Sequence, residues 1–361
     1  MANISMKIAA FRSWKEFLTL SRPYAIAGHS FTGVDLLFCE IELSNGIIGY
    51  GSGSPSEFVC GETLEASELK LREMGEAILG RRISEFWALL DGLSVNAPAT
   101  PAAVAALDMA LFDAFGKFLN IPVVDFFGRH HRKLFTSVTL GIQDLPKCKN
   151  DVEEYVQRGF KSIKIKIGED VDRDIEVVFK VQEWAGKNVK IRVDANQGYN
   201  EQQLKKFMDA TQTIVLECIE QPFPRPGIEK MRSLSRKVRS QCMADEDCKT
   251  ADDAFLLCQE SIPYGWFNIK LMKCGGIYQS TKIASLGQYL AIPLMWGCMD
   301  ESCISIAAAL HAAYAQPNTK LLDLDGSFDL AHDLAEGGFK LHDGYLELTG
   351  HPGLGIKLMT S

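Results

Sequence analysis

Three acidic residues stand at the ends of apolar, strand-like segments and could bind a metal ion together. They are Asp194, Glu220 and Asp245. If the segments are neighbouring parallel strands, three carboxylates meet at one edge, where they cannot all stay ionised without a cation. Ligation by oxygen alone favours Mg²⁺ over Zn²⁺. A single such acid is more typical of a helix N-cap, but three in successive units favour a metal site.

Lysines end similar segments and could move a proton. Lys164 and Lys166 are expected on one face of a strand because side chains alternate. Two close ammonium groups repel, so we expect the pKa of at least one to be lowered toward that of a usable base. Solvated lysines on an exposed edge are the alternative. Lys270 ends a later segment and, in a barrel, faces Lys166 across the substrate, so that one lysine removes a proton and the other returns it on the opposite face.

Two more acids, Asp323 and Asp325, end the last apolar segment and are also expected on one side of it. The metal cluster already has three acids, so this pair is better suited to a substrate ammonium group. An Asp-rich turn before Gly326 is the alternative.

The segments that carry these residues alternate with longer amphipathic stretches. Strands alternating with helices imply parallel βα units, and eight of them imply a closed barrel with its active site at the C-terminal strand ends. An open doubly wound sheet is the alternative. The eight predicted strands are Thr136–Gly141, Ser162–Ile167, Val189–Val193, Ile214–Ile219, Gln241–Ala244, Trp266–Leu271, Ile292–Trp296 and Lys320–Leu324.

The first 128 residues have a different pattern. Two apolar segments, 35–43 and 47–51, flank Asn45-Gly46, which is typical of a β-hairpin. The apolar spacing is helical over Glu62–Leu93 and Pro101–Leu119. Gly49-x-Gly51-x-Gly53 lacks the spacing of a dinucleotide-binding fingerprint. The last residues are rich in strand formers and are expected to return to this N-terminal part.

Composition narrows the class of protein. The 361 residues include 38 Lys plus Arg and 46 Asp plus Glu, a net charge of −8 that argues against a nucleic-acid partner. No apolar run approaches the ~20 residues of a membrane span, and the N-terminus has no signal-peptide pattern. The ten Cys contain no C-x-x-C pair, which favours buried thiols over a zinc site. We therefore expect a cytoplasmic protein without a membrane partner.

The set of motifs resembles the enolase superfamily, in its muconate-lactonizing-enzyme subgroup, over essentially the whole chain. The resemblance implies an α/β fold: a (β/α)7β TIM-like barrel over 129–328 and an α+β capping domain over 1–128, with the segment 329–361 returning to the cap. It also implies a homo-oligomer. The motifs are Lys164-x-Lys166, Asp194-Ala-Asn196, Glu220-Gln-Pro222, Ala244-Asp245-Glu246, Lys270 and Gly297-Cys-Met-Asp-Glu-Ser302.

The resemblance also implies roles for single residues. Asp194, Glu220 and Asp245 would hold Mg²⁺, and Lys166 and Lys270 would be the acid/base pair. Lys164 would bind the substrate and stabilise an enolate. Three more residues would support these groups from behind: Asn196, Glu246 and Glu301.

Asp323-x-Asp325 is similar to a motif of the dipeptide epimerases, in which the pair binds the α-ammonium group of the substrate. Muconate cycloisomerases and o-succinylbenzoate synthases have no such ammonium to bind. The resemblance thus implies a metal-dependent isomerase that epimerises a dipeptide at the α-carbon of its C-terminal residue. Cycloisomerase, o-succinylbenzoate synthase or acid dehydratase activity through the same enolate is the alternative, and a catalytically silent metal-binding protein is a third.

One departure from the family concerns the substrate side chain. In Ala-Glu epimerases an Arg on the first capping loop pairs with the glutamate of the substrate, whereas this chain has Gly28 or His29 at that place. An acidic second residue is therefore disfavoured and an apolar one favoured. Tyr24, Phe58 and Met299 are expected to line the pocket, with a structural role as the alternative for Phe58.

Overall fold

The computed structural model describes residues 6–26, 29–96, 99–259 and 261–359, except for the side chains of 23–31 and 96. Eight parallel strands are hydrogen-bonded in chain order, and a parallel bridge between Thr136 and Leu322 joins the last to the first. The predicted closed barrel is confirmed. The strands are β5 (Ser137–Leu140), β6 (Ser162–Lys166), β7 (Lys190–Asp194), β8 (Leu216–Glu220), β9 (Cys242–Ala244), β10 (Trp266–Ile269), β11 (Leu294–Gly297) and β12 (Thr319–Asp323).

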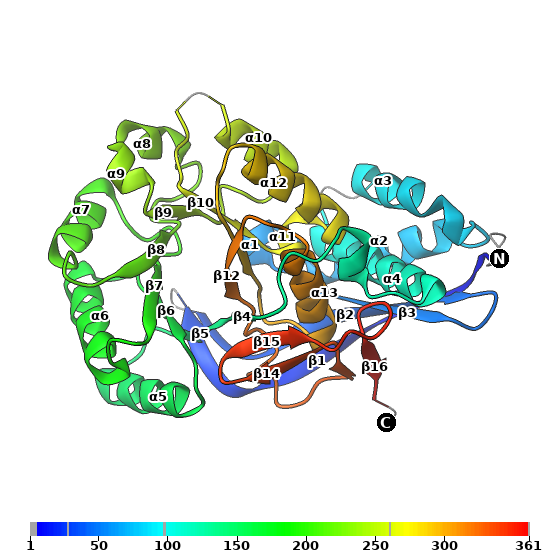
Figure 1. Ribbon diagram of the computed structural model, residues 1–361, viewed down its shortest axis with the longest axis horizontal. Helices are drawn as coiled ribbons and strands as arrows, with labels where there is room; N and C mark the ends of the chain where they lie inside the picture. Colours follow the sequence, from blue (N-terminus) through cyan, green and yellow to red (C-terminus); the bar gives the residue numbers. More distant parts are fainter. Residues whose placement is uncertain (1–5, 27–28, 97–98, 260, 360–361) are drawn as a thin grey trace.

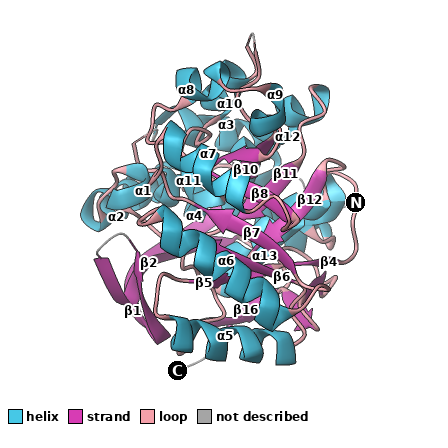
Figure 2. Cartoon of the chain, turned by 90° about the vertical axis from the view of Figure 1, so that its left-hand side faces the viewer, coloured by secondary structure: helices cyan, strands magenta, loops and turns pink. Residues whose placement is uncertain are grey.

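Helices cover the outside of this ring, as Figures 1 and 2 show for α5 and α6. In α6, Val177, Val178 and Val181 are buried on one face, and Asp170 caps the N-terminus by accepting from the backbone N–H groups of Asp172 and Arg173. The helices are α5 (Leu145–Gln157), α6 (Val171–Ala185), α7 (Glu201–Ala210), α8 (Ile228–Ser233), α9 (Arg236–Arg239), α10 (Ala251–Leu257), α11 (Leu271–Cys274), α12 (Ile277–Tyr289) and α13 (Cys303–Tyr314).

The N-terminal part is an antiparallel sheet covered by helices (Figure 1). The hairpin predicted at Asn45-Gly46 is confirmed, since β2 and β3 pair on either side of it. The long strand β1 that pairs with β2 was not predicted. The elements are β1 (Ile8–Ile26), β2 (His29–Leu43), β3 (Ile48–Gly53), α1 (Glu57–Cys60), α2 (Leu64–Ala77), η1 (Ile83–Glu85), α3 (Phe86–Asn96), α4 (Pro101–Leu119) and η2 (Val123–Phe126).

The helical stretch predicted over Glu62–Leu93 is divided between α2 and α3. The chain turns at Gly80, which has a left-handed φ of 76° and donates its N–H to the Ile8 carbonyl at 2.9 Å. The Ile8 N–H in turn donates to the Arg81 carbonyl, also at 2.9 Å. Pairing with β1 thus interrupts the helical pattern at this place.

The glycines of β3 have a packing role. A Cβ atom at Gly51 would overlap the Ala106 carbonyl, and one at Gly53 would lie 2.5 Å from the Ala102 carbonyl. Those carbonyls belong to α4, which meets the β3 glycines with alanines only, at positions 102, 106, 110 and 114. The alternating glycines therefore allow helix and sheet to approach closely.

The C-terminal tail contacts both parts of the molecule. Ala331 donates its N–H to the Thr19 carbonyl of β1 at 2.9 Å, and Leu354 donates to the buried carboxylate of Asp113 on α4 at 2.8 Å. Strand β15 also pairs with β4, directly before the barrel. The tail strands are β13 (Ala335–Gly337), β14 (Phe339–His342), β15 (Tyr345–Leu348) and β16 (Ile356–Leu358), and β4 is Leu134–Phe135. No helix in the described part of the chain is long and apolar enough to cross a membrane.

A buried histidine joins three of these segments and makes stability depend on pH. His311 on α13 accepts the Val124 N–H at Nδ1 (3.1 Å), and its Nε2 lies 3.4 Å from the Leu354 carbonyl. Burial lowers the pKa of His311 to about 3. The unfolded chain therefore binds the extra proton first, and stability falls as pH drops below ~6.5 toward 3, by about 1.4 kcal/mol per unit. Chemical denaturation across this range should show a shallower decline for His311→Gln than for the wild type.

Candidate active site

The three predicted metal ligands meet at the C-terminal ends of their strands. Asp194 ends β7, Glu220 ends β8 and Asp245 follows β9. One carboxylate oxygen of each lies within 4.8 Å of the others. All three residues are at most 1% exposed. Buried, hard oxygen donors at this separation are a ligand set that fits Mg²⁺.

Lysines from opposite sides of the ring reach the same acids. Lys166, at the end of β6, places its Nζ 2.8 Å from Asp194 and 2.9 Å from the Asn196 side-chain oxygen. Lys270, directly after β10, places its Nζ 2.8 Å from Asp245. Three strands lie between β6 and β10 on either side of the ring of eight. The acids therefore lie between two ammonium groups.

Lys164 lies deeper, among three carboxylates. Its Nζ is 3.1 Å from both Asp194 and Glu220 and 2.7 Å from Asp323. Burial works to lower the pKa of Lys164, but attraction to the three acids outweighs it and holds this pKa well above its ordinary value. Repulsion from the neighbouring Lys166 therefore does not lower the pKa of Lys164, because the nearest charges to Lys164 are negative.

The three acids differ in how far nearby lysines offset the rise in pKa that burial causes. Burial raises the pKa of Glu220, to which Asp194 adds repulsion. Burial acts in the same direction on Asp245, yet Lys270 and Lys273 outweigh it and hold the pKa of Asp245 well below its usual range. Lys166 and Lys164 likewise hold the pKa of Asp194 below its usual value against burial. Two of the acids are thus kept as carboxylates by fixed cations.

The three residues expected to support the site lie close behind it. Asn196 has a left-handed φ of 40° and receives the Lys166 ammonium. Glu246 accepts from the Gln197 side chain at 3.2 Å, and its buried Oε2 has no hydrogen-bond partner among the described residues. Glu301 is buried and accepts the Met299 N–H at 2.8 Å, which fixes the loop after β11.

The Asp323-x-Asp325 pair is at the seam between β12 and β5. Asp323 is buried and bonds to Lys164 and the Ser137 hydroxyl. Asp325 is partly exposed and accepts the Thr139 N–H at 2.7 Å. Burial and repulsion from Asp323 raise the pKa of Asp325 to about 7. Only Asp325 is thus accessible to a ligand, a difference that alternation along a strand did not indicate.

The expected pocket walls come from the cap and from the loop after β11. Phe58 on α1 is 57% exposed, and Met299 is partly buried. Lys249 bonds to the Val59 carbonyl, and the Cys60 thiol lies 3.8 Å from the Met272 carbonyl, so α1 is held beside the segment that follows Lys270. The side chain of Tyr24 lies outside the described residues.

A glycine on β11 makes room for the site. A Cβ at Gly297 would lie 2.7 Å from Asn268 Oδ1 and 3.1 Å from Lys270 Cε. We expect Gly297→Ala to displace the Lys270 side chain and to lower kcat by about 10²-fold or more. Steady-state kinetics should show this loss, whereas Gly92→Ala, where a Cβ meets nothing within 4 Å, should leave kcat unchanged. Equal kcat for Gly297→Ala and wild type would contradict the crowding argument.

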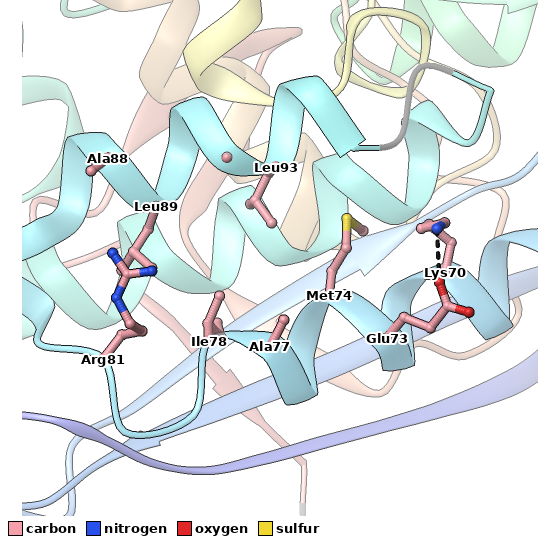
Figure 3. Close-up of a pocket in the computed structure, with 10 residues that line it drawn as sticks. Lys70, Glu73, Met74, Ala77, Ile78, Arg81, Ala88, Leu89 and Leu93 are labelled. Carbon is pink, nitrogen blue, oxygen red and sulfur yellow. Dashed lines mark hydrogen bonds and ion pairs between the residues drawn. The ribbon is translucent and has the colours of Figure 1, made fainter.

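A separate cavity of about 310 Å³ lies between α2 and α3 (Figure 3). No predicted site residue lines it. Its walls come from the cap helices and the turn between them: Lys70, Glu73, Met74, Ala77, Ile78, Arg81, Ala88, Leu89, Gly92 and Leu93.

Comparison with known proteins gives relatives along the whole chain. The L-Lys-D/L-Arg epimerase of Desulforapulum autotrophicum is 44% identical over 98% of this chain and 99% of its own. The hydrophobic dipeptide epimerase of Enterococcus faecalis is 35% identical over 97% of this chain and 99% of its own. A dipeptide epimerase from Methylococcus capsulatus, solved with Mg and the dipeptide L-Arg-D-Lys, is 44% identical with a TM-score of 0.95, covering 97% of this chain and 99% of that one.

Family models match both parts of the molecule. The mandelate racemase/muconate lactonizing enzyme N-terminal domain matches residues 11–128. The enolase C-terminal domain-like family matches residues 147–361. Together with the barrel and its three acids, these matches show that the chain belongs to the mandelate racemase/muconate lactonizing enzyme group of the enolase superfamily.

Proposed function

We propose that this protein is a Mg²⁺-dependent dipeptide epimerase that inverts the α-carbon of the C-terminal residue of its substrate. The observation that carries the proposal is the position of Lys166 and Lys270, which reach one buried group of acids from opposite sides of the barrel. Relatives over the whole chain, named as dipeptide epimerases, support it. The protein is accordingly an isomerase that acts on amino-acid derivatives.

Asp194, Glu220 and Asp245 are the residues that would hold the metal ion. An Mg²⁺ ion held there would supply positive charge for a substrate carboxylate and for the negative charge that develops when the α-proton leaves. Asn196, Glu246 and Glu301 keep the surrounding side chains and loops in place. Lys164 adds an ammonium beside the same carboxylates, which hold its pKa well above the ordinary value.

The proton transfer itself needs two groups on opposite faces of the α-carbon. One of Lys166 and Lys270 removes the α-proton as a neutral amine, and the other, as an ammonium, returns a proton to the opposite face. The first lysine ends the step charged and the second neutral, so the protons balance. Each lysine exchanges its protons with solvent before the next turnover.

The substrate's free ammonium group is assigned to the Asp323-x-Asp325 pair. Asp325 supplies the accessible carboxylate, and Asp323 neutralises Lys164 beneath it. An ammonium close to Asp325 favours the carboxylate form of that residue. A substrate without an ammonium would leave the Asp325 carboxylate without a charged partner, which disfavours simple carboxylic acids.

The second residue of the substrate is proposed to be non-acidic. The capping loop has Gly28 and His29 where an Arg would pair with a glutamate, and an apolar side chain is what the sequence favours. A basic side chain is favoured by the names of the two L-Lys-D/L-Arg epimerases that are 44% identical. Tyr24, Phe58 and Met299 are the residues proposed to contact it.

A dipeptide library in D₂O tests the activity and the preference together. Purified protein with Mg²⁺ is incubated with L,L-dipeptides that carry Leu, Lys or Glu as second residue, and deuterium at the α-carbon is read by mass. We expect exchange with Leu or Lys and little with Glu. No exchange with any dipeptide would refute the epimerase, and fastest exchange with Glu would refute only the side-chain preference.

A further inference from the structure

A buried lysine that the proposed reaction does not use lies against the metal site. Lys273 is on α11, three positions after Lys270, and its side chain is 1% exposed. Its Nζ lies 2.7 Å from the Asp245 carbonyl and 3.0 Å from the Asn268 carbonyl, and it also bonds to Asp245 Oδ1. An ammonium has three N–H donors. All three donors of Lys273 are therefore engaged.

Lys270 contacts the other oxygen of the same carboxylate but is less constrained. Its Nζ makes one hydrogen bond among the described residues, to Asp245 Oδ2 at 2.8 Å. Two donors remain for other partners. The two lysines therefore differ in kind: one is fixed to three acceptors, and the other is able to change partners during a reaction.

The contacts of Lys273 extend to a second acid. Asn268, whose carbonyl receives Lys273, donates from its side chain to Glu220 Oε1 at 2.7 Å. Lys273 thus links Asp245, directly after β9, to Asn268 on β10. The Asn268 side chain in turn bonds to Glu220 at the end of β8. One buried ammonium is connected to two of the three carboxylates.

We propose that Lys273 is a positioning residue for the metal site, which orients Asp245 through one oxygen and leaves Lys270 available for proton transfer. The inference rests on the proposed Mg²⁺ site. It predicts a change in Mg²⁺ affinity that is opposite in direction to a simple charge effect. Removing a nearby positive charge by itself tightens the binding of a cation, whereas loss of orientation weakens it.

Calorimetric titration of the full-length protein with MgCl₂ alone tests this. For Lys273→Met we expect binding about 10- to 100-fold weaker than for the wild type. Lys273→Gln keeps N–H donors without the charge, so we expect a smaller loss. Thermal unfolding of each variant, followed in parallel, reports whether it is folded at the titration temperature.

Lys117→Met is a matched control in the cap. Lys117 Nζ bonds to the buried Asp113 carboxylate at 2.6 Å and to the Ile48 carbonyl at 2.8 Å, the same kinds of partner that Lys273 has. We expect this variant to lose thermal stability but to bind Mg²⁺ as the wild type does. An equal loss of Mg²⁺ affinity in Lys117→Met would overturn the inference, because general destabilisation would then account for the effect.

The remaining outcomes separate this inference from the proposed function. Wild-type protein that binds no Mg²⁺ would remove the proposed metal site and the inference with it. Wild-type protein that binds Mg²⁺, together with Lys273 variants that bind it equally or more tightly, would overturn the inference alone. If Lys273→Met does not fold, Lys273→Gln decides in the same way: weaker binding supports positioning, and equal or tighter binding overturns it.

Discussion

Replacing either lysine at the opposite faces of the site is expected to abolish epimerisation. For Lys166→Ala and Lys270→Ala we expect a loss of about 10³-fold or more in kcat, since each variant lacks one of the two proton carriers. The remaining lysine still faces one side of the α-carbon. Each variant should therefore exchange the α-proton of only one epimer with D₂O, and the epimer should differ between the two variants.

Proton NMR in D₂O, started separately from the L,L and L,D forms of one dipeptide, measures both quantities. Lys282→Ala, which removes a lysine stacked on Tyr278, is a control that should keep full activity. A Lys166 or Lys270 variant that still interconverts the epimers at the wild-type rate would contradict the two-base mechanism. Exchange of the same epimer by both variants would contradict their placement on opposite faces.

Removing the accessible carboxylate of Asp325 should lower activity on substrates that have a free ammonium group. For Asp325→Asn we expect kcat/KM for a dipeptide to fall roughly 30- to 1000-fold, because the ammonium loses its charged partner. This factor corresponds to about 2–4 kcal/mol of lost transition-state binding. The N-acetylated dipeptide has no ammonium, so its low rate should not fall further. Kinetics with this substrate pair give the comparison.

Asp323→Asn should behave differently, although the two acids belong to one motif. Asp323 is bonded to Lys164 and Ser137, so its replacement also disturbs the ammonium beside the metal site. We expect a loss with both substrates. If Asp325→Asn slows the N-acetylated dipeptide as much as the free one, the assignment of Asp325 to the ammonium is wrong.

The sequence was most informative where local pattern and chemistry coincide. Apolar segments that end in Asp194, Glu220 and Asp245 predicted both the strands and the meeting of their carboxylates, because parallel strands in a barrel place their C-terminal ends together. The Asn45-Gly46 hairpin could be predicted for a similar reason, since the turn requires those residue types.

Contacts between distant segments were not predictable in this way. Nothing in the spacing around Asp323 indicates that Lys164 would bind it, because that contact depends on the closing of the ring. Lys273 is in a four-residue helix whose sequence resembles any short apolar stretch with one charge. The high pKa of Lys164 could not be predicted either, because it depends on the acids that the fold brings around this lysine more than on the nearest lysine in sequence.

The seam between β5 and β12 has a consequence for synthesis of the protein on the ribosome. Ser137 and Asp323, which bond across the seam, are 186 positions apart in the chain. A growing chain therefore exposes Lys164, Asp194, Glu220 and Asp245 well before the strand that closes the ring has been translated. Any sheet formed before then would have two unpaired edge strands, and such edges invite association between chains. The strand that ends at Asp323 is thus also the one that closes the ring and pairs these edges.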